Sequence, residues 1–201
     1  YDPTKAAKLL LEAGWEPTAQ GTRVNKKGEK LSLEIMTTAG NRSRELVEQV
    51  LQSQWKSLGI EVRIRNQPAR IFFGETVSQR KFEAMAMFAW ISAPESVPRT
   101  TLQSSYIPRE ENNYAGQNYT GFKNKEVDQL INKLEVQLDK NKRLQMWNRL
   151  QQIYTKELPA IPLYFRANPF VLPKWLSGVE PTGHQYPSSL WVENWKRTGR
   201  H

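Results

Sequence analysis

The feature that most constrains the fold is a strand–helix–strand pattern in the first third of the chain. Residues 31–36 alternate apolar and polar side chains, which is the period-two pattern of a half-buried strand. Residues 46–58 then place apolar side chains on one face of a helix that ends at Gly59, and residues 60–64 alternate again. Strands joined in this way are expected to lie parallel, with a right-handed crossover. The pattern therefore predicts an α/β fold.

Five further elements are predicted around this unit. Residues 2–15 combine an N-cap Asp, a Pro at the first helical position and a Gly just past the end, which predicts a helix. A third helix is expected to close near Lys81, and the nearly continuous apolar run 82–90 is interpreted as a buried central strand. Amphipathic helices are predicted to begin at Asn124 and after Asp139.

The remaining segments are irregular. Residues 16–30 are polar and contain a turn. Residues 91–123 show no periodicity, and irregular segments of this length in a compact domain are usually functional or mobile. Residues 159–165 have Pro near their start and are expected to be extended. The tail 170–201 carries several Pro and Trp residues, so it is expected to pack on this domain or on a partner rather than form long regular elements.

The chain is basic, with 29 Lys and Arg against 20 Asp and Glu and a formal net charge of +9. Such a surplus is compatible with a nucleic-acid-binding module, particularly beside exposed aromatic side chains. The basic residues are scattered, however, and neither a basic stripe nor a nucleic-acid motif is present. We interpret most of them as solvated surface charges and expect no nucleic acid as a partner. A protein-interaction module that docks through its tail is the other alternative.

Enzymatic chemistry is not expected. The sequence has no Cys, which excludes disulfides, thiolate metal sites and a Cys nucleophile. Only His184 and His201 are present, both in the tail, so a His-based triad or metal cluster is not expected. No Gly-rich phosphate-binding loop appears either. We therefore expect neither a catalytic residue, nor a metal, nor a cofactor.

Four segments, in the same order and spacing, resemble the second lobe of the extracytoplasmic solute-binding proteins of oligopeptide and dipeptide ABC importers (family 5). These segments are residues 1–15, 51–62, 118–131 and 159–164. The resemblance covers nearly the whole chain, but only the C-terminal portion of a complete binding protein. It implies a lobe like those of type II periplasmic binding proteins, with a mixed sheet flanked by helices.

The resemblance also implies a domain organisation and a role. Residues 1–163 would form the second lobe, and residues 164–201 would return through the hinge to a first lobe that this sequence lacks. The protein would be the substrate-binding component of an importer, and this lobe would form one wall of a cleft that captures oligopeptides or a related small solute for a membrane permease. It would be a monomer in the periplasm or another extracytoplasmic space, with its signal or lipoprotein segment outside this sequence.

The same resemblance assigns candidate ligand-binding residues. Trp90 corresponds to an aromatic residue that lines the cleft, although the residues alone favour a core aromatic at a strand end. The loop beyond it would supply further contacts, and two residues of the third matching segment would lie near the cleft. The full candidate set is Trp90, Ile91, Ser92, Ala93, Glu95, Asn118 and Tyr119.

One position departs from the family pattern. Many peptide-binding relatives carry an Asp three residues after the cleft Trp, where it captures the free amine of a peptide, whereas this sequence has Ala93. Ala93 cannot form that ion pair, and Glu95 would supply a carboxylate only if the loop is shifted. A longer peptide held by its backbone and a non-peptide solute both stay open.

Overall fold

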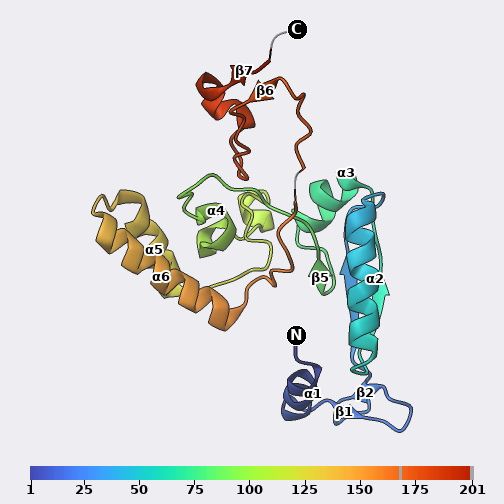
Figure 1. Cartoon of the computed structure of the whole chain (residues 1–201). Coiled ribbons are helices and arrows are strands. Elements are labelled where there is room, and N and C mark those ends of the chain that lie inside the picture. The colour runs from blue at the N-terminus through green and yellow to red at the C-terminus, as the bar shows by residue number, and fades with distance from the viewer. Residues whose placement is uncertain (168, 200–201) are drawn as a thin grey trace. The chain divides into compact units, whose positions relative to one another are not determined.

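The computed structural model describes residues 1–167 and 169–199, and these form two compact units (Figure 1). The first unit comprises Tyr1–Phe88 and Ile107–Gly121, and the second comprises Ala89–Tyr106 and the chain from Phe122 onward. The expected boundary after residue 163 falls inside the second unit. The separate role of residues 164–201 therefore stays a prediction.

A three-stranded parallel sheet lies at the centre of the first unit. In it, β3 (Ser32–Met36) lies between β4 (Glu61–Ile64) and β5 (Met85–Ala86). Both neighbours run parallel to β3, so the predicted strand–helix–strand unit is confirmed. The α/β fold class is confirmed as well.

The prediction of a central strand over residues 82–90 is wrong in position and length. Only Met85 and Ala86 join the sheet, at its edge, where they pair with Ile35 and Met36. The apolar run suggested a strand buried on both faces, but its residues 84–88 are only half-buried. Phe82 and Phe88 of this run pack in an apolar side-chain cluster with Phe72 rather than forming part of the sheet.

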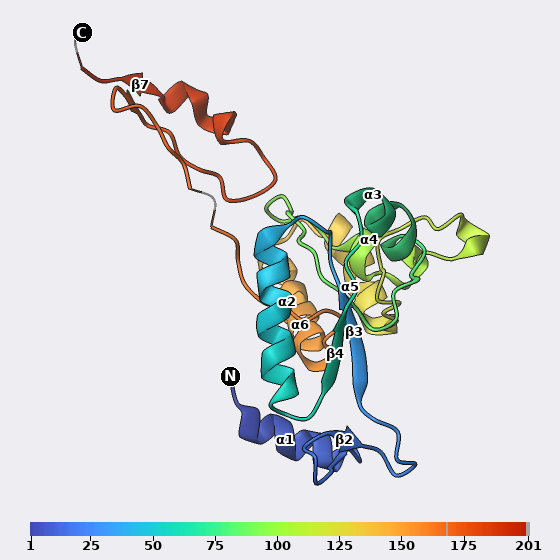
Figure 2. The same cartoon turned by 90° about the vertical axis from the view of Figure 1, so that its right-hand side faces the viewer.

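One face of the sheet is covered by α2 (Arg42–Lys56), which runs beside β3 and β4 (Figure 2). Leu51 and Trp55 of α2 pack against Ile35 and Val62. The helix begins at Asn41, whose Oδ1 accepts a hydrogen bond from the backbone N–H of Arg44. The part of the predicted apolar face from Leu51 onward thus packs on the sheet, whereas Leu46 and Val50 of that face are exposed.

The N-terminal segment forms a helix and a hairpin. The helix α1 (Pro3–Glu12) is capped by Asp2, whose Oδ1 accepts from the N–H of Lys5 at 2.8 Å, as predicted. The polar stretch after it contains the antiparallel strands β1 (Glu16–Pro17) and β2 (Arg23–Val24), which the sequence did not predict. The buried Arg23 side chain donates to the carbonyl of Leu58 at 2.6 Å. This polar contact fixes the hairpin to the end of α2, and a contact of this kind leaves no apolar repeat in the sequence.

The expected third helix is present in an unusual form. A short α-helical turn, α3 (Ala69–Ile71), continues into a π-helix, η1 (Phe72–Val77). Phe72 and Val77 of η1 are fully buried against Met36. Since π-helical segments occur frequently at functional sites, η1 indicates that a functional site lies in this region.

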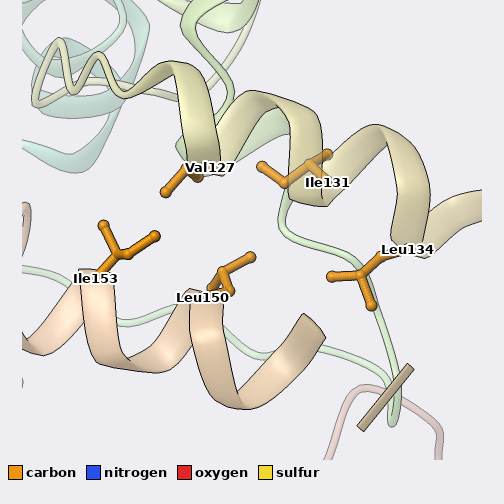
Figure 3. Close-up of a cluster of buried hydrophobic side chains, with 5 residues drawn as sticks. All are labelled: Val127, Ile131, Leu134, Leu150 and Ile153. Carbon is orange, nitrogen blue, oxygen red and sulfur yellow. The ribbon is translucent and has the colours of Figure 1, made fainter. Parts of the chain in front are cut away.

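The second unit is built on two helices, α5 (Lys125–Val136) and α6 (Lys140–Glu157), both predicted. Their facing sides bury a cluster of five apolar side chains: Val127, Ile131, Leu134, Leu150 and Ile153 (Figure 3). The caps Asn124 and Asp139 stand where the sequence placed the helix starts.

The remaining described residues are irregular, as predicted. Residues 159–165 contain neither helix nor strand. The long segment 91–123 and residues 170–199 of the tail hold only short elements, namely α4 (Arg99–Leu102), η2 (Ser104–Tyr106), η3 (Glu110–Asn112), β6 (Leu176–Ser177), η4 (Ser188–Asn194) and β7 (Lys196–Arg197). The strands β6 and β7 pair antiparallel.

Candidate ligand-binding site

The three parallel strands of the first unit end at the same edge of the sheet, and polar side chains follow two of them. Thr37 and Thr38 come directly after β3, and Asn66 and Gln67 follow β4. In open α/β sheets, ligands bind outside the carboxyl ends of the strands. This edge is therefore the candidate site of the first unit.

Hydrogen bonds join these strand ends to one another. Asn66 Oδ1 accepts from the backbone N–H of Thr37 at 2.9 Å, and Thr37 Oγ1 donates to the carbonyl of Met87 at 2.6 Å. Gln67 Oε1 accepts from Thr76 Oγ1 at 2.7 Å. Buried polar groups that are paired in this way hold a backbone in one arrangement. The carboxyl edge is consequently a defined structure rather than a set of loose loops.

A buried carboxyl group is attached to this network. Glu48 of α2 is 0% exposed, and its Oε2 accepts from Asn66 Nδ2 at 2.8 Å. Within the part of the chain that the structure describes, its Oε1 has no hydrogen-bond partner. Burial raises the pKa of Glu48, the hydrogen bond from Asn66 opposes that rise, and the nearby charge of Glu45 adds to it.

Beside the polar network, four aromatic rings pack edge to face. Phe72 and Phe73 of η1 lie 4.9 Å apart, and Phe88 lies 6.1 Å and 5.7 Å from them, as measured between ring centroids. The ring of Tyr119 lies 6.2 Å from that of Phe88. Phe72 is fully buried, but Phe73 is 41% exposed, so the cluster combines a packed base with an accessible ring.

The two candidates from the third matching segment lie in this region. Asn118 is fully buried, with its carbonyl accepting from the N–H of Gly121 at 3.1 Å. The carbonyl of Tyr119 accepts from Arg80 Nε at 2.9 Å, and burial raises the pKa of its phenol. Asn118 therefore helps to form the turn, whereas Tyr119 presents a half-buried ring to the aromatic cluster.

The other candidates belong to the second unit. Trp90 and Ile91 are 53% and 61% exposed, which differs from the environment of a core aromatic. The carbonyl of Ser92 accepts from the N–H of Gln185 at 3.3 Å, and that of Ala93 accepts from the N–H of Ser96 at 3.2 Å.

Glu95 occupies the left-handed region of backbone space, with φ of 57°. Its carboxylate lies 3.6 Å from the guanidinium of Arg143 on α6. The side chain that would replace the missing Asp of the family pattern thus has a cationic neighbour in its own unit.

The candidates divide between the two units. The first unit brings Asn118 and Tyr119 together with the carboxyl edge of the sheet, and the second unit holds Trp90 through Glu95. The chain passes from one unit to the other between Phe88 and Ala89.

Sequence reasoning missed several residues of the carboxyl edge, above all Glu48, Asn66 and Thr37. One signal was available for Glu48, because it lies three and seven residues before Leu51 and Trp55 and so shares the apolar face of α2. A charged residue at such a position is an anomaly that points to a buried polar interaction.

The described residues contain neither a metal-binding cluster nor a membrane-spanning helix. No group of three or more His, Cys, Asp or Glu side chains is arranged to hold a metal ion, and no helix has both the length and the apolar character needed to cross a membrane. His184 packs edge to face on Tyr186 with centroids 5.3 Å apart, and His201 lies outside the described residues.

Comparison with known proteins gives the chain a family. Residues 1–113 match the model of the bacterial extracellular solute-binding proteins, family 5 (middle region). Among curated proteins, the chain is similar to the oligopeptide-binding protein AppA of Bacillus subtilis, with 29% identity over 89% of this chain and 32% of that protein.

Solved structures support the same relationship. An oligopeptide-binding protein of Thermus thermophilus in complex with a pentapeptide is similar with a TM-score of 0.80 and 34% identity, over 98% of this chain and 35% of that one. A mannohexaose-bound periplasmic oligopeptide-binding protein of Thermotoga maritima shares the fold, with a TM-score of 0.73 and 23% identity, over 83% of this chain and 31% of that one.

The chain thus spans about a third of the length of these relatives, at 32% and 35% of the first two. Their fold is that of type II periplasmic binding proteins, as expected from the sequence. Members of this family are binding proteins rather than enzymes. The matched region covers more than half of the chain, and the chain therefore belongs to the bacterial extracellular solute-binding proteins of family 5.

Proposed function

We propose that this chain supplies one lobe of the substrate-binding component of an ABC importer and forms one wall of a cleft for oligopeptides or a related small solute. The observation that carries the proposal is the carboxyl edge of the parallel sheet, where a hydrogen-bonded polar network lies beside an accessible aromatic cluster. Apolar rings with a few fixed polar groups are what small-ligand sites commonly offer. Binding and delivery to a membrane permease, without chemistry, would be its task.

The side chains favour a peptide held along its length over one captured by its amine. Ala93 carries no carboxylate, and the carboxylate of Glu95 faces Arg143. Aromatic faces such as that of Tyr119 accept side chains of many shapes at a small entropic cost. The relative from Thermus thermophilus was solved with a pentapeptide, which makes peptides of about this length the first ligands to test.

The tail, residues 164–201, is proposed to pack on the first lobe, which would complete the cleft. Tyr164, Phe165, Val171 and Trp175 are all exposed, and Phe165 has no measurable burial. Apolar surface of this extent usually marks a contact with another protein part. Residues 1–163 would thus form this lobe and residues 164–201 would return to the first lobe of a longer, monomeric, extracytoplasmic protein.

Native mass spectrometry of that longer protein, gently purified, tests the proposal. Peptides of similar length and mixed sequence should co-purify and should be lost in Tyr119→Ala, because the ring at the carboxyl edge would be gone. Tyr1→Ala, at a residue that is 94% exposed, is the matched control and should retain them. A single non-peptide mass would keep the transport role and change the solute, whereas salt-sensitive nucleic acid would contradict the role itself.

A further inference from the structure

Four segments of the first unit are connected by one line of hydrogen bonds. It starts at Glu48 on α2, passes through Asn66 after β4 and Thr37 after β3, and ends at the carbonyl of Met87 after β5. The three distances are 2.8, 2.9 and 2.6 Å, all within the range of normal hydrogen bonds. We refer to these four residues as the strand-end relay.

The relay fixes the backbone where β5 ends. The N–H of Met87 donates to the carbonyl of Met36 at 2.8 Å while its own carbonyl accepts from Thr37, so both polar groups of this peptide segment are held. The next residue, Phe88, carries the ring that contacts Tyr119. A shift of the backbone at Met87 would therefore move the ring that supports the proposed ligand-contacting tyrosine.

Packing alone does not explain the carboxyl group. Glu48 shares the apolar face of α2 with Leu51 and Trp55, where an apolar residue would avoid the cost of burying an acid. The amide of Asn66 donates to Glu48 and accepts from Thr37, so the carboxyl group determines which way that amide points. The acid has a geometric consequence at the strand ends that an apolar side chain would lack.

We propose that Glu48 is a positioning residue of the ligand site, acting through Asn66 and Thr37 on the backbone at Met87 and Phe88. The inference rests on the proposed function only for the identity of the site, because the relay itself can be measured without a ligand. Around the carboxyl group, Glu45 on the same helix is the charge that acts on it, and the strand ends present the uncharged Asn66 and Thr37. A change in the protonation of Glu48 is thus transmitted to Asn66 first.

Hydrogen–deuterium exchange of residues 84–90 between pH 5 and pH 9, corrected for intrinsic exchange rates, tests this proposal. In the wild type, corrected exchange at Met87 and Phe88, taken relative to that of the rest of the first unit, should fall with pH as Glu48 ionises, because a carboxylate accepts more strongly from Asn66 Nδ2 than a carboxylic acid does. Glu48→Gln should remove that fall. Thr37→Val, which deletes the donor to Met87, should increase exchange about fivefold at every pH, as expected for the loss of one hydrogen bond of about 1 kcal/mol.

A matched control separates the relay from general destabilisation. Thr18→Val removes a half-buried threonine hydroxyl that bonds to Thr22 in the β1–β2 hairpin rather than to the relay, and should leave exchange at Met87 and Phe88 at the wild-type level. Equal relative pH profiles of the wild type and Glu48→Gln at residues 84–90 would overturn the proposal, and so would an increase in Thr37→Val that is spread evenly over α1, α2 and the sheet. Since no ligand is added, a failure of peptides to co-purify would count against the proposed function and not against the relay.

Discussion

Two buried acids of the first unit differ in what surrounds them. Glu34 on β3 faces Arg65, whose guanidinium donates to both carboxylate oxygens at 2.8 and 2.9 Å. Glu48 meets the neutral amide of Asn66 instead, and the charge of Glu45 nearby is of the same sign. Burial disfavours ionisation of an acid that has no cationic partner.

This difference predicts opposite effects of two isosteric substitutions on stability. Since the pKa of Glu48 is raised, its contribution to the free energy of unfolding is fully present below the ordinary carboxyl pKa of about 4.3 and is lost as pH rises through the raised pKa. Glu48→Gln should lack this loss and exceed the wild type at pH 8 by about 1–3 kcal/mol, the cost of an uncompensated buried polar group. Urea titrations across this pH range measure it.

Glu34→Gln is the control, because it removes the charge that Arg65 faces and should lower stability at pH 8. Parallel pH profiles of the wild type and Glu48→Gln would contradict the prediction. That result would mean that Glu48 keeps an ordinary pKa in the folded chain.

The connection between α2 and β4 depends on the backbone of Gly59. Its φ is 81°, and a Cβ at this position would lie 2.5 Å from the carbonyl oxygen of Gly21, which belongs to the backbone and cannot move aside. Gly59→Ala should therefore lower the free energy of unfolding by more than the roughly 1–2 kcal/mol that a left-handed Ala costs by itself. Gly74→Ala is the control, because φ there is not positive and a Cβ would meet no atom within 4 Å. Equal urea midpoints for the two variants would refute this account.

The helix pair of the second unit allows a test of the apolar cluster in Figure 3. Leu134 of α5 is fully buried, whereas Leu138, in the turn before α6, is 94% exposed. Leu134→Ala should lower the free energy of unfolding by about 2–5 kcal/mol, because a cavity remains where the side chain was. Leu138→Ala should change it by less than about 0.5 kcal/mol. Far-UV circular dichroism during thermal unfolding measures both, and similar losses would show that the buried cluster does not stabilise this pair.

Periodicity and capping residues predicted the long elements well. Helix starts at Asp2, Asn124 and Asp139 are visible in the sequence because each supplies a side-chain cap next to an apolar repeat. The hairpin β1–β2 was missed because its two-residue strands are too short to show periodicity. The run 82–90 was wrongly predicted as a central strand because apolar composition does not show whether a strand lies at the centre or at the edge of a sheet.

The site was less accessible to sequence reasoning than the fold. Tyr119 and Trp90 were identified through a family resemblance, and their roles as ligand contacts stay predictions. The relay was not found, because Thr37 bonds to partners 29 and 50 positions away in the sequence. Contacts over such separations are set by the pairing of strands, which local patterns do not specify.

At the scale of the whole chain, which carries a net charge of +9, several of the basic residues form local ion pairs with acids. Arg63 lies 3.0 Å from Glu83, and Arg149 lies 2.6 Å from Glu126. Exposed pairs of this kind contribute little to stability, but they reduce the field that would attract a polyanion. The interpretation of the basic residues as surface charge is consistent with this arrangement.

A pentapeptide of mixed sequence is expected to bind this 201-residue chain at least about 100-fold more weakly than the longer protein of the proposed function. One wall supplies only part of the contacts, and no second lobe can close to exclude water. Isothermal titration of both proteins at 50 and 300 mM NaCl measures the difference, and the affinity of the longer protein should change little between the two salt concentrations because apolar and backbone contacts dominate. A single-stranded oligonucleotide serves as the control, since its binding to a polyanion site would weaken steeply over the same range. Equal peptide affinity of the two proteins would mean that this chain holds a complete site by itself, and the role of one wall in a two-lobed cleft would have to be abandoned.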